Sequence, residues 1–145
     1  MTNQTKTHRL LLIEDDQAHA DLIQMTLEDH GDDLDINHVN NGAKAIDYLR
    51  NQGEYTEATR PDLVLLDLNL PKISGHEVLE QIKSDESLQS IPVVVLTTSA
   101  NEQDISKAYR HNANSYLTKP ADFQKFQSMI HDLRAYWTKW NCNSV

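Results

Sequence analysis

Three acidic side chains, a hydroxyl and a lysine each follow a short apolar run of the sequence: Glu14, Asp15, Asp67, Thr97 and Lys119. Carboxylates brought together repel one another and raise each other's pKa unless a cation lies between them. Hard oxygen ligands suit Mg²⁺. An aspartate beside such an ion can act as a nucleophile toward a phosphoryl group, whose oxygens a lysine and a hydroxyl would neutralise. These residue types therefore predict a magnesium-assisted phosphoryl-transfer site, with Asp67 as the nucleophile.

The apolar runs that precede these residues have the length and composition of strands. Continuous aliphatic runs are typical of parallel strands buried on both faces, whereas weaker, alternating runs suit edge strands. Segments with helical periodicity lie between them, so strand and helix alternate five times. This order predicts an open, doubly wound α/β sheet. The expected strands are 10–13, 34–39, 63–66, 93–96 and 114–118.

In such sheets the functional crevice lies beyond the carboxyl ends of the strands. Side chains that are far apart in the sequence therefore meet at one edge. Asp67 stands at the end of a central strand, so we expect it to point into a polar crevice without being buried.

Composition limits the possible functions. The chain has 145 residues, 39% of them hydrophobic, and a formal net charge of −9, as expected for one acidic globular domain. The negative charge argues against binding to DNA or to an anionic membrane. With a single cysteine, Cys142, and no apolar signal segment or membrane-spanning run, we expect a cytoplasmic protein.

Four segments, "LLLIEDD", "LVLLDLNLP", "VVVLTTS" and "YLTKP", resemble in order the signature segments of the receiver domain of two-component response regulators. The resemblance spans about residues 9–133. It implies a flavodoxin-like five-stranded parallel sheet of strand order 2-1-3-4-5, with helices on both faces. It also implies one receiver domain over 1–145, with a core of about 8–135 and a helical C-terminal extension of about 136–145.

The resemblance implies roles for individual residues. Asp67 would be the phosphoacceptor, in a reaction that needs Mg²⁺, for which Mn²⁺ or Ca²⁺ could substitute in crystals. The family also implies a cis peptide bond between Lys119 and Pro120. The other implied positions are the metal ligands Glu14, Asp15, Asp67 and the backbone carbonyl of Asn69, the switch hydroxyl of Thr97, the phosphoryl-binding Lys119 and the switch aromatic Tyr116.

Two positions depart from the family pattern. Thr98 replaces the small residue that usually follows the switch threonine, and we expect it to narrow the access of hydrolytic water. Asn112 replaces a common glycine after the fourth helix, where asparagine tolerates the left-handed conformation.

The loop at 51–61, the segments that follow it and the tryptophan-containing tail resemble single-domain regulators that serve phytochrome-type histidine kinases, especially in cyanobacteria. This resemblance implies a sensor histidine kinase as partner and a role in red-light signalling.

The last helix has apolar residues at alternating three- and four-residue steps, typical of a heptad seam. Its first half would face the core. Its distal end, with Trp137 and Trp140, would overhang the sheet, and exposed tryptophans often anchor interfaces. We therefore expect a homodimer or kinase contact through the fourth helix, the fifth strand and the fifth helix, with Tyr109, Tyr116, Trp137 and Trp140 as candidate interface residues.

Other interpretations remain open from the sequence. A haloacid-dehalogenase-type phosphatase also uses a strand-end aspartate, but it needs a second aspartate where Asn69 stands. A flavodoxin-like carrier needs a phosphate-cradling loop where this chain has Glu14, Asp15 and Asp16. A receiver-like module that is never phosphorylated is a third possibility, and Tyr116 could be a static packing residue. The seven histidines show no metal-ligand spacing and are interpreted as structural or surface residues.

Overall fold

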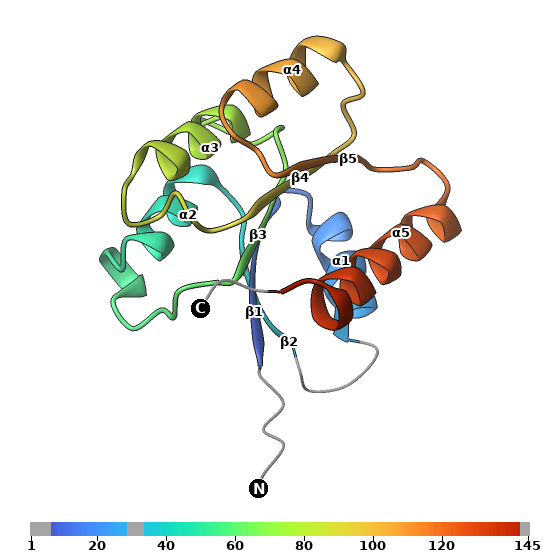
Figure 1. The fold of residues 1–145 in the computed structure, drawn as a ribbon, viewed down its shortest axis with the longest axis horizontal. Coiled ribbons are helices and arrows are strands. Elements are labelled where there is room, and N and C mark those ends of the chain that lie inside the picture. The colour runs from blue at the N-terminus through green and yellow to red at the C-terminus, as the bar shows by residue number, and fades with distance from the viewer. Residues whose placement is uncertain (1–6, 29–33, 143–145) are drawn as a thin grey trace, which may run out of the picture.

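The computed structural model describes residues 7–28 and 34–142 of the chain. Five parallel strands form one sheet of order β2-β1-β3-β4-β5, with helices on both faces (Figure 1). The predicted fold class and strand order are therefore confirmed. The strands are β1 His8–Ile13, β2 Leu34–Val39, β3 Leu63–Leu66, β4 Val93–Thr97 and β5 Ser115–Thr118.

The continuous aliphatic runs occupy the centre of the sheet. β1 pairs with β2 and β3, and β3 also pairs with β4. Every residue of β3 and β4 is buried, because helices cover both faces of these strands. β2 and β5 lie at the edges and are only partly buried, as their weaker apolar patterns predict.

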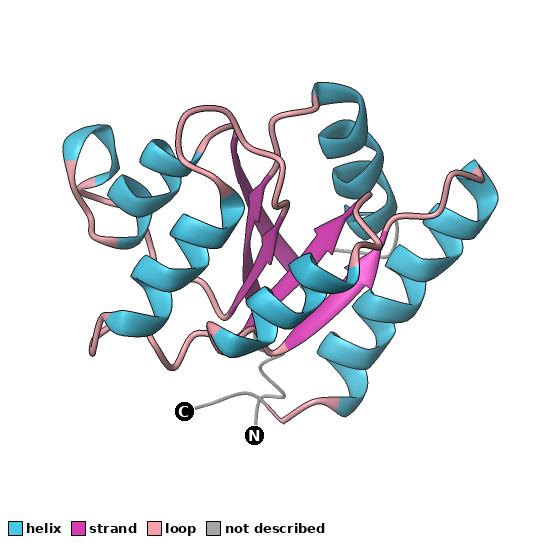
Figure 2. Cartoon of the chain, turned by 90° about the horizontal axis from the view of Figure 1, so that it is seen from above, coloured by secondary structure: helices cyan, strands magenta, loops and turns pink. Residues whose placement is uncertain are grey.

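The helices divide between the two faces of the sheet. In Figure 1, α2, α3 and α4 lie on one side of the strands, and α1 and α5 lie on the other. Figure 2 shows the same division from above. Each layer encloses its own apolar core. The helices are α1 Gln17–Glu28, α2 Gly42–Leu49, α3 Gly75–Ser84, α4 Glu102–Arg110 and α5 Phe123–Ala135.

Polar side chains at the strand-to-helix turns begin several helices. Asn41 caps α2 by accepting a hydrogen bond from the Lys44 backbone N–H, and Asn101 caps α4 in the same way. Such caps satisfy backbone donors that have no partner within the helix. After α4, Asn112 adopts a φ of 70°, which confirms the left-handed position predicted for it.

The C-terminal segment corrects one prediction. After α5 the chain continues as a π-helix, Tyr136–Trp140, in which Trp140 is 78% exposed but Trp137 is only 7% exposed. Trp137 belongs to the same apolar core as Phe126 and Ile130. The expected overhang is therefore right for Trp140 and wrong for Trp137. The sheet side of this core includes Leu63 and Val94, at the start of β3 and β4, so the core reaches far enough to include Trp137.

Two further observations bear on the predictions. Residues 143–145 of the expected C-terminal extension lie outside the described residues. Within the described ranges, no helix combines the length and the apolar composition needed to cross a membrane.

Candidate functional site

A buried ion cluster lies at the carboxyl ends of β1 and β3. The Lys119 ammonium contacts Glu14 Oε1 and lies 3.0 Å from Asp67 Oδ2. Glu14 is 1% exposed, and Asp67 and Lys119 are each 6% exposed. The expectation that Asp67 would not be buried is therefore wrong. Its charge is tolerated because Lys119 compensates it and the Asn69 backbone N–H donates to Asp67 Oδ1 at 3.0 Å.

The strand ends hold these side chains together through the backbone. The Asp67 N–H donates to the Ile13 carbonyl at 3.0 Å, and the Lys119 N–H donates to the Thr97 carbonyl at 2.7 Å. The sheet thus extends one residue beyond each strand, which sets Asp67 beside the β1 end. The described residues contain no cis peptide bond, so the cis form expected for Lys119–Pro120 is wrong; trans is the form that X–Pro bonds intrinsically prefer.

The two buried carboxyls differ in their pKa values. Burial, together with the hydrogen bond and charge of Asp67, raises the pKa of Glu14 from 4.5 to about 7, although Lys119 acts in the opposite direction. Burial also acts to raise the pKa of Asp67. The hydrogen bonds from Glu14 and from the Asn69 N–H, with the Lys119 charge, outweigh it, so the pKa of Asp67 lies below its ordinary value. Asp67 is therefore the carboxylate that stays ionised, as a nucleophile must.

The acidic side chains also form a possible metal site. Glu14, Asp15 and Asp67 each offer a carboxylate oxygen, and these oxygens lie within 4.8 Å of one another. Asp15 is exposed, which leaves an open side through which an ion and its water ligands could enter. Such a donor set fits a hard divalent cation. The structure brings together these three of the four predicted ligands; the role expected for the Asn69 carbonyl stays a prediction.

The predicted switch residues lie on the neighbouring loop. Thr97 is fully buried, and its Oγ1 lies 3.5 Å from both Asn69 Nδ2 and the Ser99 backbone N. The Tyr116 hydroxyl donates to the Ser99 carbonyl at 2.8 Å. The Asn69 side chain and Tyr116 are therefore both connected to the segment that begins at Thr97.

Sequence reasoning missed a polar chain that continues from this loop. The Ser99 hydroxyl donates to Asp104 Oδ2 at 2.6 Å, and His76 Nε2 lies 3.1 Å from Asp104 Oδ1. Ser99, two residues after β4, is thereby linked to α4 through Asp104 and to α3 through His76. These residues lie on separate elements, and no spacing in the sequence indicates their contact.

Sequence reasoning also missed His19, whose Nδ1 lies 3.0 Å from the Lys119 ammonium. The only signal was its position four residues after Asp15, one helical turn into α1. Lys119 is a hundred residues away in the sequence, so the pairing needs the folded sheet to become visible.

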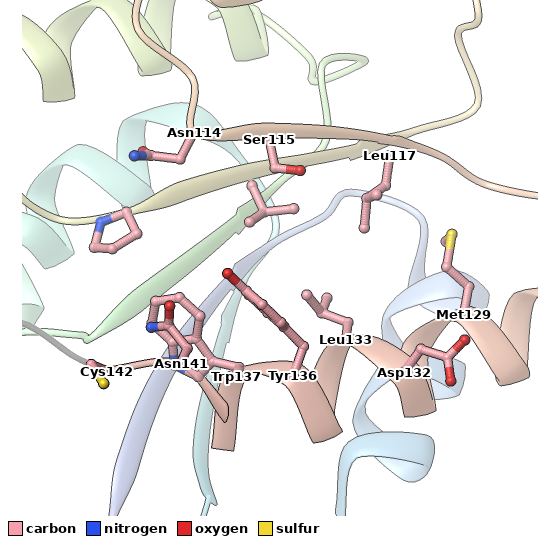
Figure 3. A pocket seen from close by; sticks show the side chains of 12 residues that line it. Asn114, Ser115, Leu117, Met129, Asp132, Leu133, Tyr136, Trp137, Asn141 and Cys142 are labelled. Atoms are coloured by element: carbon pink, nitrogen blue, oxygen red, sulfur yellow. The ribbon is translucent and has the colours of Figure 1, made fainter. Parts of the chain in front are cut away.

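The candidate interface residues do not form one exposed patch. Tyr109 is 48% exposed on α4, Tyr116 is half-buried, and Trp137 is buried. Figure 3 shows a pocket between β5 and the end of α5, where Leu133, Tyr136 and Trp137 face Ser115 and Leu117 across an apolar hollow.

Known proteins share both the sequence and the fold. The family model of the response regulator receiver domain matches residues 10–131. The probable methanogenesis regulatory protein FilR2 of Methanothrix harundinacea (strain 6Ac) is 46% identical over 132 residues, which cover 91% of this chain and 84% of FilR2. The response regulator Rcp1 of Synechocystis sp. (strain ATCC 27184 / PCC 6803 / Kazusa) is 42% identical over 128 residues, which cover 88% of this chain and 87% of Rcp1.

Solved structures agree with these matches. The phosphorylated cyanobacterial phytochrome response regulator RcpA superimposes with a TM-score of 0.93 at 42% identity, covering 96% of this chain and 99% of that one. The Mn²⁺-bound form of Rcp1 superimposes with a TM-score of 0.91 at 39% identity, covering 95% and 99%. Because the family model covers most of the chain and the fold agrees throughout, the chain belongs to the response regulator receiver domain family.

Proposed function

We propose that this receiver domain accepts a phosphoryl group on Asp67 from a sensor histidine kinase. The observation that carries the proposal is the ionised Asp67 carboxylate, held 3.0 Å from the Lys119 ammonium beside two further carboxylates. In the transfer, a P–O bond to Asp67 forms as the P–N bond of the kinase phosphohistidine breaks. Lys119 then compensates the charge on the phosphoryl oxygens.

The metal in this proposal is Mg²⁺, held by Asp15, Glu14 and Asp67, with the Asn69 carbonyl as a further ligand. When bound, the ion would offset the charge of the carboxylates and orient the phosphoryl donor. The Mn²⁺-bound structure of Rcp1 supports a divalent ion in this family. The choice of Mg²⁺ follows from the hard oxygen donors and from its use with phosphate substrates.

Labelling with acetyl phosphate tests the proposal. Wild-type protein with Mg²⁺ should acquire one phosphoryl group, detected by intact mass, and Asp67→Asn should acquire none. Chelation of the metal should abolish labelling of the wild type. Rapid, repeated release of phosphate without a stable labelled form would instead indicate that the protein is a phosphatase. We expect no such turnover, because the amide side chain of Asn69 does not ionise and cannot act as the general acid and base.

We further propose that phosphorylation acts through a conformational switch. Thr97 would move toward the phosphoryl oxygens, and the β4–α4 loop, which Tyr116 contacts at Ser99, would follow. A ligand or modification shifts such an equilibrium only by its differential stabilisation of the two states. The phosphoryl group supplies that difference here, because it adds charge where Thr97 and Lys119 converge.

The partner that we propose is a phytochrome-type kinase. The support is the similarity to Rcp1 and to the cyanobacterial phytochrome response regulator RcpA. Phosphotransfer from purified histidine kinases, with a phytochrome kinase among them, measures the preference directly. Faster phosphotransfer from an unrelated kinase would contradict light as the input signal, but it would leave the phosphoacceptor role of Asp67 intact. The cytoplasmic location expected from the sequence stays a prediction.

We also propose that the chain forms a homodimer through α4, β5 and α5. Tyr109 on α4 and Trp140 after α5 are large exposed side chains, and an apolar hollow lies between β5 and α5. The formal net charge of −9 argues against DNA as the target, and this supports another protein as the partner. The whole chain would act as one receiver domain, with residues after 135 serving this contact.

A further inference from the structure

The Lys119 ammonium has three hydrogen-bond partners. A lysine ammonium carries three N–H donors and no acceptor. In this structure the partners are Glu14 Oε1, Asp67 Oδ2 at 3.0 Å and His19 Nδ1 at 3.0 Å. Because the Lys119 side chain is 1% exposed, water has little access to replace any of them. His19 therefore completes the donor requirements of the buried lysine.

This contact determines the tautomer of His19. A lysine can only donate, so His19 Nδ1 must accept, and the ring proton must lie on Nε2. The ring is held in place by the edge of the Phe126 ring, with centroids 6.0 Å apart and planes at 71°. The His19 backbone N–H donates to Asp16 Oδ1 at 3.1 Å, which fixes the first turn of α1.

We infer that His19 is a positioning residue that holds the Lys119 ammonium in place for phosphorylation of Asp67. The inference rests on the proposed function of Asp67 and deepens it. Two carboxylates alone leave the third Lys119 donor without a partner, and the flexible lysine stem would then be free to rotate. With the third acceptor in place, the ammonium has one orientation, directed at Asp67 and Glu14.

The experiment measures the rate at which acetyl phosphate labels Asp67 at pH 8 with saturating Mg²⁺. In this reaction a P–O bond to Asp67 forms, the donor P–O bond breaks and acetate leaves. His19→Ala should lower the rate at pH 8 by about tenfold, the effect of losing one hydrogen bond to a buried charge. His19→Gln, whose side-chain oxygen can accept from Lys119, should keep a rate close to that of the wild type at pH 8.

Rescue by His19→Gln separates positioning from a merely structural role, because glutamine restores an acceptor for Lys119 but not the imidazole ring that contacts Phe126. His111→Gln is the matched control: His111 is the C-cap of α4, at the other end of the sheet, and the substitution should leave the wild-type labelling rate unchanged.

Nitrogen NMR of the imidazole provides a readout that does not depend on labelling. The unphosphorylated protein at pH 8 should show the Nε2–H tautomer of His19. If wild-type protein is never labelled, the proposed function fails, and the tautomer still tests the contact. The inference would be overturned by any one of three results: a wild-type labelling rate for His19→Ala, a labelling rate of His19→Gln as low as that of His19→Ala, or a proton on His19 Nδ1 at pH 8.

Discussion

At the scale of single residues, the ionised form of Glu14 is unfavourable in the folded, metal-free protein. The side chain is 1% exposed, and its pKa is raised from 4.5 to about 7, chiefly by burial and secondarily by Asp67. Between these two pH values the folded protein binds a proton that the unfolded chain has released. Because stability falls with pH wherever the folded state binds more protons, Glu14 destabilises the metal-free fold progressively as pH rises from about 4.5 to about 7, and the loss is complete above that range.

Replacement of Glu14 by glutamine should therefore stabilise the metal-free protein at high pH. The effect should be small near pH 4.5 and grow to on the order of 3 kcal/mol above pH 8, since each unit of pKa shift corresponds to about 1.4 kcal/mol. Chemical denaturation of both proteins across this pH range measures it. Saturating Mg²⁺ should reduce the difference in the free energy of unfolding between the two proteins, because a bound cation favours the charged form of Glu14. A difference in the free energy of unfolding that stays constant from pH 5 to 8 would contradict the raised pKa of Glu14.

Thr98 is the residue whose effect should appear after phosphorylation. Its side chain is exposed and lines a shallow pocket with His19, Lys119 and Phe123, next to the proposed phosphorylation site. The threonine side chain is larger than the small residue usual at this position, and it should hinder the approach of hydrolytic water. The aspartyl phosphate of Thr98→Ala should therefore be hydrolysed several-fold faster than that of the wild type. Loss of the intact-mass label over time gives the rate. Equal rates in the two proteins would show that Thr98 does not limit access.

At the scale of elements, α3 packs directly against the backbone that carries Asp67. A Cβ atom added to Gly75, the first residue of α3, would lie 2.3 Å from the Asp67 carbonyl oxygen and 2.5 Å from the Leu68 Cα. The Gly75 N–H also donates to the Leu68 carbonyl at 3.0 Å. Both obstructing atoms belong to the backbone, so no side-chain rotation can relieve the clash.

Gly75→Ala should consequently damage both the fold and the site. Overpacking of this kind costs about 1–3 kcal/mol, and the forced shift of Asp67 should also slow its labelling by acetyl phosphate. Gly53→Ala is the matched control. Gly53 has a φ of 60°, so alanine there is strained by about 1–2 kcal/mol, but its nearest neighbour is the Asp47 side chain at 3.6 Å. Comparable destabilisation with normal labelling is expected for Gly53→Ala, and normal labelling of Gly75→Ala would contradict the prediction.

The sequence predicted the elements better than the contacts between them. Continuous aliphatic runs of four to six residues that end in polar residues are typical of central parallel strands, so β1, β3 and β4 and their polar ends were predictable. The pairing of His19 with Lys119 and of His76 with Asp104 was not, since each joins residues from different elements through side-chain orientation alone. The burial of Asp67 was missed for the same reason: it depends on Lys119, which arrives from another strand.

At the scale of the whole molecule, two apolar layers enclose the sheet, and one of them extends to the chain's last helical turn. Trp137 closes the layer between α1, α5 and the sheet, whereas Trp140, three residues later, is 78% exposed. The apolar residues along this helix therefore serve two functions. Its inner tryptophan stabilises the fold, and its outer tryptophan is available to a partner.

Single substitutions should separate these two functions. Trp137→Ala should lower the free energy of unfolding by about 3–5 kcal/mol, as expected for loss of a large buried side chain. Trp137→Phe should cost much less, because the indole Nε1 has no hydrogen-bond partner among the described residues.

Trp140→Ala should leave stability within about 0.5 kcal/mol of the wild type, yet weaken the proposed homodimer. Sedimentation velocity of phosphorylated and unphosphorylated protein measures the dimer, and acrylamide should quench the fluorescence of Trp140 but hardly that of Trp137. If Trp140→Ala and the wild type sediment alike in both states, Trp140 takes no part in self-association, and the exposed end of the seam must serve a different partner.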